Sequence, residues 1–297
     1  MKLFKINILL LVILISSTSH SKNILVSIRP IMSIVKNITC DDHIELLINK
    51  NISPHHYHLS PSDLSLLKKA DVIIIVSRDL ETSIYKAIIK NEEFKNKLVV
   101  LEDTPGLKLR KFDSPKEFFY SSHHHHHEVD PHIWLDVSNV QLIAQNLVKK
   151  TLKTKTSKSC QLENYTKYSE VLKRAQNKIQ NELASDRSKS IIATHDAYNY
   201  LLNESDINTV GVLFSNHNSP PTIKELQNLK RFIQNKEVNC VIVEPQFRSK
   251  SIDDFLKSLK VKKAVVDIEW GPKVKIEDVY HKMMISTTKS ISACLKN

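Results

Sequence analysis

The segment IIATHDAYNYLL, residues 191–202, places an apolar strand, a histidine and a helix in direct succession. Residues 191–194 have the apolar, β-branched character of a short buried strand, and residues 197–202 have the character of a helix. His195 is therefore expected at the carboxyl end of a strand, where α/β proteins place ligand groups. Asp196 could bind the same ligand, support His195 or cap the helix, and of these we expect the cap.

The same alternation of strands and helices continues along the chain. Further strands are predicted at residues 24–28, 44–48, 72–76, 98–101, 210–213, 241–243 and 264–266. Further helices are predicted at residues 31–38, 63–70, 80–89, 223–234, 252–259 and 277–295. This order predicts an α/β fold of two lobes, each with a mainly parallel sheet flanked by helices.

Residues 161–187 differ because they contain no Gly or Pro and have apolar residues at helical spacing. They predict one amphipathic helix of about 40 Å that joins the lobes. A coiled-coil dimer is the alternative, but the apolar stripe is short and interrupted. We expect an N-terminal lobe at residues 22–160 and a C-terminal lobe at residues 188–297.

The N-terminus has the pattern of a secretory signal peptide at residues 1–21. Lys2 and Lys5 precede ten apolar residues, 6–15, and small residues follow. Ten apolar residues are too few to span a bilayer, which needs about 20. We therefore expect export to a periplasm and no stable membrane insertion.

The net charge of +11 raises the question of a nucleic-acid partner. The lysines are scattered and no nucleic-acid motif is present, so none is expected. Only three glycines occur, which excludes a P-loop or a G-x-G-x-x-G turn.

Histidine recurs in three motifs far apart in the chain: PHHYHLSPSD (54–63), DPHIWLD (130–136) and ATHDAYNYL (193–201). Imidazole suits borderline divalent metals, and a zinc site needs three or four N, O or S ligands. We predict one metal site assembled from His55, His132 and His195. Asp130 is expected to accept from His132 and fix its tautomer.

The loop before the helix start SPSD, residues 60–63, carries His55, His56 and His58, of which at most two can reach one ion. A second kind of signal is the run His123, His124, His125, His126 and His127 in the loop 121–129. Consecutive residues cannot all face one metal, so the run predicts a weak zinc-collecting loop, or else compositional drift.

Four cysteines in an oxidising compartment are expected to pair rather than bind metal, and none has C-x-x-C spacing. They allow three pairings, between which the composition does not decide.

Five motifs together resemble the zinc-binding solute-binding proteins of bacterial ABC importers, within the cluster A-I metal-binding group. They are HxYxLxPSD (55–63), HxWL (132–135), HDAYxY (195–200), CVxxEPQF (240–247) and CLK (294–296). The resemblance covers essentially the whole mature chain, and a histidine-rich loop before HxWL is typical of the zinc members.

The resemblance implies that His55, His132 and His195 bind the metal between the lobes. It points to Asp267 as a fourth ligand or near neighbour, although the usual DPLG block is DIEWG here, residues 267–271. Some relatives have a glutamate before the first histidine, where this chain has Pro54. Water is the alternative fourth ligand.

The resemblance also implies a disulfide between Cys240 and Cys294. It does not place Cys40 and Cys160, which either pair with each other or stay free.

The function implied is capture of Zn²⁺ as cargo, without catalysis, by a monomer that docks through both lobes on an inner-membrane ABC permease. Three imidazoles favour zinc over manganese, which prefers oxygen ligands. The alternatives are a manganese or iron member of the same family, a metal-dependent adhesin or zinc chaperone of this fold, and a secreted zinc enzyme with a three-histidine site. For the enzyme, Glu244 is the only carboxylate in a motif that fits a general base.

Overall fold

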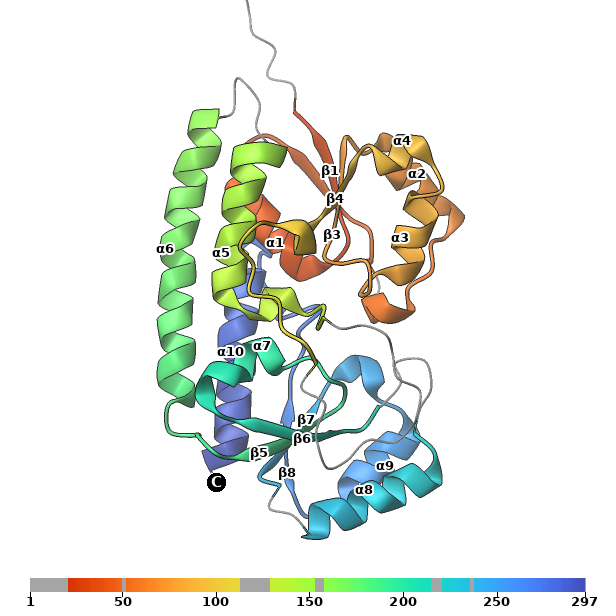
Figure 1. Cartoon of the computed structure of the whole chain (residues 1–297), viewed down its shortest axis with the longest axis vertical. Helices are drawn as coiled ribbons and strands as arrows, with labels where there is room; N and C mark the ends of the chain where they lie inside the picture. Colours follow the sequence, from red (N-terminus) through yellow and green to blue (C-terminus); the bar gives the residue numbers. More distant parts are fainter. Residues whose placement is uncertain are drawn as a thin grey trace, which may run out of the picture.

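Two four-stranded parallel sheets with the same strand order form the centres of two lobes (Figure 1). The computed structural model describes residues 21–49, 52–112, 129–152, 158–214, 221–235 and 238–296. The N-terminal sheet has the order β2-β1-β3-β4, and the C-terminal sheet has the order β6-β5-β7-β8. The predicted fold class is therefore confirmed.

All eight predicted strands are present, and each differs from its prediction by at most two residues at either end. The N-terminal strands are β1 (Asn23–Val26), β2 (His43–Leu46), β3 (Val72–Ile75) and β4 (Leu98–Val100). The C-terminal strands are β5 (Ser190–Ala193), β6 (Asn208–Val212), β7 (Cys240–Val243) and β8 (Lys262–Val265). Ile24 pairs with Ile44 and Val72, and Ile191 pairs with Thr209 and Cys240, so the two central strands of each sheet lie side by side.

Helices cover both sheets. Those of the first half are α1 (Arg29–Ile38), α2 (Pro61–Lys69), α3 (Thr82–Ile88), α4 (Glu92–Lys95) and α5 (Val137–Asn146). Those of the second half are α6 (Lys158–Leu183), α7 (Asn199–Leu202), α8 (Ile223–Asn235), α9 (Lys250–Ser258) and α10 (Val279–Lys296). The one-turn helix α4 was not predicted, because four residues carry no periodic signal.

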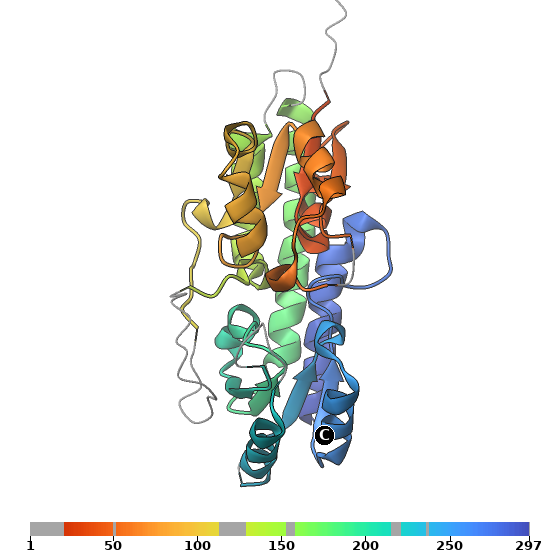
Figure 2. The ribbon, with the colours of Figure 1, turned by 90° about the vertical axis from the view of Figure 1, so that its right-hand side faces the viewer.

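The predicted connecting helix is α6, which begins three residues earlier and ends four residues earlier than expected. It runs beside both lobes, and α10 runs alongside it (Figures 1 and 2). None of the helices in the described ranges is long and apolar enough to cross a membrane.

One hydrophobic core runs through both lobes. It extends from the N-terminal sheet through α6 and α10 to residues of β5, β7 and β8. A second, smaller core lies between the C-terminal sheet and the helices α8 and α9. Because native cores are densely packed, a shared core resists independent movement of the lobes.

Two disulfides fasten the long helices. Cys240 in β7 bonds to Cys294 in α10, as the resemblance implied. Cys40, just after α1, bonds to Cys160 in the first turn of α6, which settles the pairing that the sequence left open. Each lobe is thereby tied covalently to one of the two helices that run along both lobes.

Candidate metal centre

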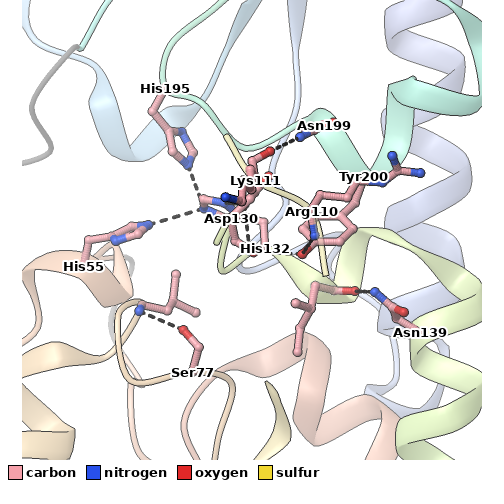
Figure 3. Close-up of polar contacts among 12 residues, drawn as sticks. His55, Ser77, Arg110, Lys111, Asp130, His132, Asn139, His195, Asn199 and Tyr200 are labelled. Carbon is pink, nitrogen blue, oxygen red and sulfur yellow. Dashed lines mark hydrogen bonds and ion pairs between the residues drawn. The ribbon is translucent and has the colours of Figure 1, made fainter. Parts of the chain in front are cut away.

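Three histidine side chains, two from the N-terminal half and one from the C-terminal half, point toward one another (Figure 3). The Nε2 atom of His132 lies 3.3 Å from Nε2 of His55 and 3.2 Å from Nε2 of His195. The ligand atoms of all three lie within 4.8 Å of one another. His132 and His195 are fully buried, whereas His55 is half-buried.

Two of the three nitrogen separations match the edge of a zinc tetrahedron. Zn–N bonds of about 2.0–2.1 Å at tetrahedral angles place neighbouring nitrogens about 3.3–3.4 Å apart. Two nitrogen lone pairs at 3.2 Å repel unless a proton or a cation lies between them. The arrangement is therefore suited to a divalent ion that replaces the proton.

His55 is set by its loop. It lies in the 3-10 helix Pro54–His56, which precedes α2. The buried Asp63 accepts from the backbone N–H of Ser60 at 2.7 Å and from the Tyr57 hydroxyl at 2.9 Å. These bonds form the predicted helix start and hold the loop that carries His55.

His132 is oriented by Asp130, as predicted. The Asp130 Oδ1 atom lies 2.7 Å from His132 Nδ1 and also accepts from the His132 backbone N–H at 2.9 Å. A carboxylate at Nδ1 fixes the proton there, so the Nε2 lone pair faces the centre of the site. Asp136 accepts from the N–H groups of Ser138 and Asn139 and caps α5.

His195 lies two residues after the end of β5, and its Nδ1 atom lies 2.8 Å from Oε1 of Glu244. Glu244 is fully buried and follows β7, the neighbour of β5 in the sheet. The ring of Phe247 stacks on the His195 ring with centroids 4.7 Å apart. The motif CVxxEPQF thus supplies both the acceptor and the packing surface of His195.

The surroundings shift the pKa values of the two buried histidines in opposite directions. Burial, with the nearby His195, holds the pKa of His132 well below its usual value. Burial also acts to lower the pKa of His195, but the charge and hydrogen bond of Glu244, with the charges of Glu269 and Asp196, together outweigh it, and that pKa is raised. His132 is therefore neutral and ready to bind a metal. His195 holds its proton more tightly and must release it before it can bind.

Asp267 is not part of the three-histidine group. Its Oδ1 atom accepts from the backbone N–H groups of Glu269 and Trp270 at 3.2 and 2.8 Å, and from Gln246 Nε2 at 3.0 Å. Asp267 thus caps the turn after β8 through this oxygen. The expectation of Asp267 as a fourth ligand stays a prediction, and one of its two carboxylate oxygens is already taken up by this turn.

Glu269, two residues later, also lies outside the three-histidine group, but its negative charge helps to raise the pKa of His195. It is 3% exposed, and its Oε1 atom accepts from the Ser53 hydroxyl at 2.8 Å. Its Oε2 atom is buried without a hydrogen-bond partner in the described part of the chain. Burial, with the charge of Glu244, raises the pKa of Glu269 to about 8. A buried oxygen without a donor is suited to a cation.

The other predicted histidines do not join the group. His56 is half-buried and His58 is exposed, and neither belongs to the three-histidine group. The run His123–His127 lies outside the described residues.

Two functional side chains, Glu244 as partner of His195 and Glu269, were missed by the sequence reasoning. For Glu244 a signal exists, because a strand beside β5 ends directly before it. For Glu269 the signal is only its position two residues after Asp267, and the direction of its side chain depends on the turn.

The chain matches the family model described as zinc-uptake complex component A, periplasmic, over residues 24–294. A high-affinity zinc uptake system protein ZnuA of Haemophilus ducreyi is 31% identical over 99% of both chains. The protein of the same description from Haemophilus influenzae is 26% identical, again over 99% of both chains.

A solved structure, the periplasmic zinc binding protein TroA of Treponema pallidum, has the same fold. Its TM-score is 0.72 at 19% identity, over 94% of this chain and 100% of that chain. The family model covers nearly all of the sequence, including the three histidine motifs and both disulfides. The chain therefore belongs to the family of the periplasmic component A of zinc-uptake complexes.

Proposed function

We propose that this protein captures one Zn²⁺ ion between its lobes with His55, His132 and His195 and delivers it to the membrane permease of an ABC transporter. The observation that carries the proposal is the spacing of the imidazole nitrogens, 3.2 and 3.3 Å, at the edge length of a zinc tetrahedron. Membership of a zinc-uptake family supports zinc as the cargo.

The fourth position is assigned to Glu269 in this proposal. Three neutral imidazoles and one carboxylate leave a bound zinc ion with a small net charge, which suits a buried site. The ligand set is poor in oxygen, so it favours zinc over manganese. Glu269 replaces Asp267, whose oxygen caps the turn.

A cargo site is favoured over a catalytic one by the position of Glu244. A hydrolytic zinc enzyme needs a carboxylate that is free to take a proton from a metal-bound water. Glu244 is fully buried and lies against His195 Nδ1, on the side of the ring away from the other histidines. It is placed to orient a ligand, not to serve as a base.

Membership of the zinc-uptake family supports a permease in the membrane as the partner. We propose that a monomer, exported through the signal peptide 1–21 to the periplasm, docks on the permease through both lobes. The continuous core through α6 and α10 supports small movements between the lobes rather than a free hinge.

The test is a competitive titration of the metal-free mature protein with zinc, using a chelator of known affinity and excess manganese. We expect one tight zinc per chain, and weaker sites that disappear when residues 123–127 are deleted. Loss of a residue that only supports a metal ligand typically lowers affinity up to about 100-fold. The variant His132→Ala removes a ligand itself, so its zinc affinity should fall further.

The matched control is His58→Ala, on the same loop as His55 but exposed and outside the group. It should bind zinc like the wild type. Manganese competing on equal terms, or His58→Ala failing as badly as His132→Ala, would show that the ligand assignment is wrong.

A further inference from the structure

The chain between β8 and α10 leaves the C-terminal lobe and lies against the N-terminal lobe. We call residues 267–274 the strap. It includes Glu269, and its contacts reach residues that are 134 to 245 positions away in sequence.

The near end of the strap is held within the C-terminal lobe. Asp267 caps the turn through the N–H groups of Glu269 and Trp270, and Gln246 donates to the same oxygen. A short Asp side chain that accepts from the two following N–H groups fixes a turn strongly. This fixes where Glu269 leaves the sheet.

The far end is held by Arg29, the first residue of α1 in the N-terminal lobe. Its Nη1 atom donates to the carbonyls of Trp270 and Pro272 at 2.5 and 3.0 Å, and its Nη2 atom donates to Val274 at 3.3 Å. One half-buried guanidinium therefore binds three carbonyls of the strap. Hydrogen bonds from a charged donor are about twice as strong as neutral ones.

Between these ends, the strap touches both N-terminal segments that carry metal-site histidines. Ser53, two residues before His55, donates to Glu269. The indole of Trp134, two residues after His132, donates to the Ile268 carbonyl at 3.0 Å. The position of the strap is thus coupled to both histidines.

The backbone of the strap is tightly constrained at Gly271. Its φ of +64° lies in the left-handed region, and a Cβ atom there would lie 3.1 Å from the Cβ of Met283 in α10. The strap is held between α10 and Arg29, so releasing Arg29 frees one side of it.

We infer that Arg29 is a positioning residue of the metal site: it fastens the strap across the lobes, keeps Glu269 beside the histidines, and thereby slows release of the ion. The inference rests on the proposed zinc site. It adds that the release rate is controlled by a side chain that does not touch the metal.

The test compares zinc dissociation from Arg29→Gln and wild type by mixing the zinc-loaded mature protein with excess chelator. We expect about 10-fold faster release, the lower range for loss of a supporting partner. Arg29→Lys should be intermediate, since an ammonium keeps the charge but cannot match the planar fork. Urea unfolding of each metal-free variant checks that it is folded.

The matched control is Arg78→Gln, which removes another N-terminal-lobe guanidinium, one that pairs with Glu102 and Asp103. Its release rate should equal that of the wild type.

A double-mutant cycle separates positioning from general loosening. If Arg29 acts through Glu269, adding Arg29→Gln to Glu269→Gln should change the release rate little further. Unchanged release in Arg29→Gln, or effects that simply add, would overturn the inference while leaving the zinc site standing. Absence of tight zinc binding in the wild type would overturn both.

Discussion

The two lobes place a buried glutamate at the same point of the same sheet topology, and use it differently. In the N-terminal lobe, Glu81 lies at the carboxyl ends of β1 and β3, where it accepts from Ser27 Oγ at 2.6 Å and from two backbone N–H groups at 3.0 Å. In the C-terminal lobe, Glu244 lies at the corresponding ends of β5 and β7, against His195.

The difference lies in the donors. All three donors to Glu81 belong to its own lobe, so this carboxylate closes the crevice between the central strands. Glu244 faces an imidazole whose other nitrogen is directed to the neighbouring histidines. A carboxylate at the end of a strand can support a ligand site. Whether it does so depends on the residue that it faces, which is a histidine only in the C-terminal lobe.

The largest expected effect is on stability, from Glu81→Ala. It leaves a buried hydroxyl and two buried N–H groups without an acceptor, and it opens a cavity. We expect a loss of about 3–5 kcal/mol in the free energy of unfolding, measured by urea denaturation of the metal-free protein. Zinc affinity of the folded fraction should be unchanged. A large loss of zinc affinity would show that Glu81 supports the metal site as well as the fold.

The next effect is on zinc affinity, from Glu244→Gln. The amide keeps the shape but no longer supports His195 with a charge, so affinity should fall about 10- to 100-fold in the chelator titration. The free energy of unfolding should change less than in Glu81→Ala.

The same variant should alter the protons released on zinc binding. Glu244 raises the pKa of His195, so its removal lowers that pKa and leaves fewer protons to displace near neutral pH. Calorimetry in buffers of different ionisation enthalpy counts them. An unchanged count would mean that His195 is neutral in the wild type.

The last effect is a pH dependence of the free energy of unfolding that belongs to Glu81. Burial raises its pKa from 4.5 to about 7, so between these values the folded protein binds more protons than the unfolded chain. The stability that proton binding by Glu81 gives the folded state is therefore fully present below pH 4.5. It is lost as the pH rises to 7, by at most about 1.4 kcal/mol per pH unit.

The measurement compares urea unfolding of the metal-free wild type with Glu81→Gln across this range, because the amide cannot ionise. The wild type should lose stability relative to the variant as the pH rises. Parallel curves would indicate that the three donors keep Glu81 ionised throughout.

Prediction from sequence succeeded where local pattern and strand ends suffice. His132 with Asp130, and the capped start of α2, follow from residues within a few positions of one another. The pairing of Cys40 with Cys160 and the facing of Glu244 to His195 depend on how distant segments meet, which no local pattern encodes. Whether Asp267 or Glu269, two residues apart, completes the metal site depends on the turn after β8, whose shape no local pattern encodes.

Helix α10 begins at residue 279 and yet packs against α6, α1 and the C-terminal sheet. It is synthesised after every other element described. A chain interrupted before this helix would leave apolar surface uncovered on both lobes at once, including the partners of Tyr280, Met283 and Met284, which are all fully buried. Completion of both lobes therefore waits for the last helix, and we expect a chain truncated before residue 279 to be unfolded.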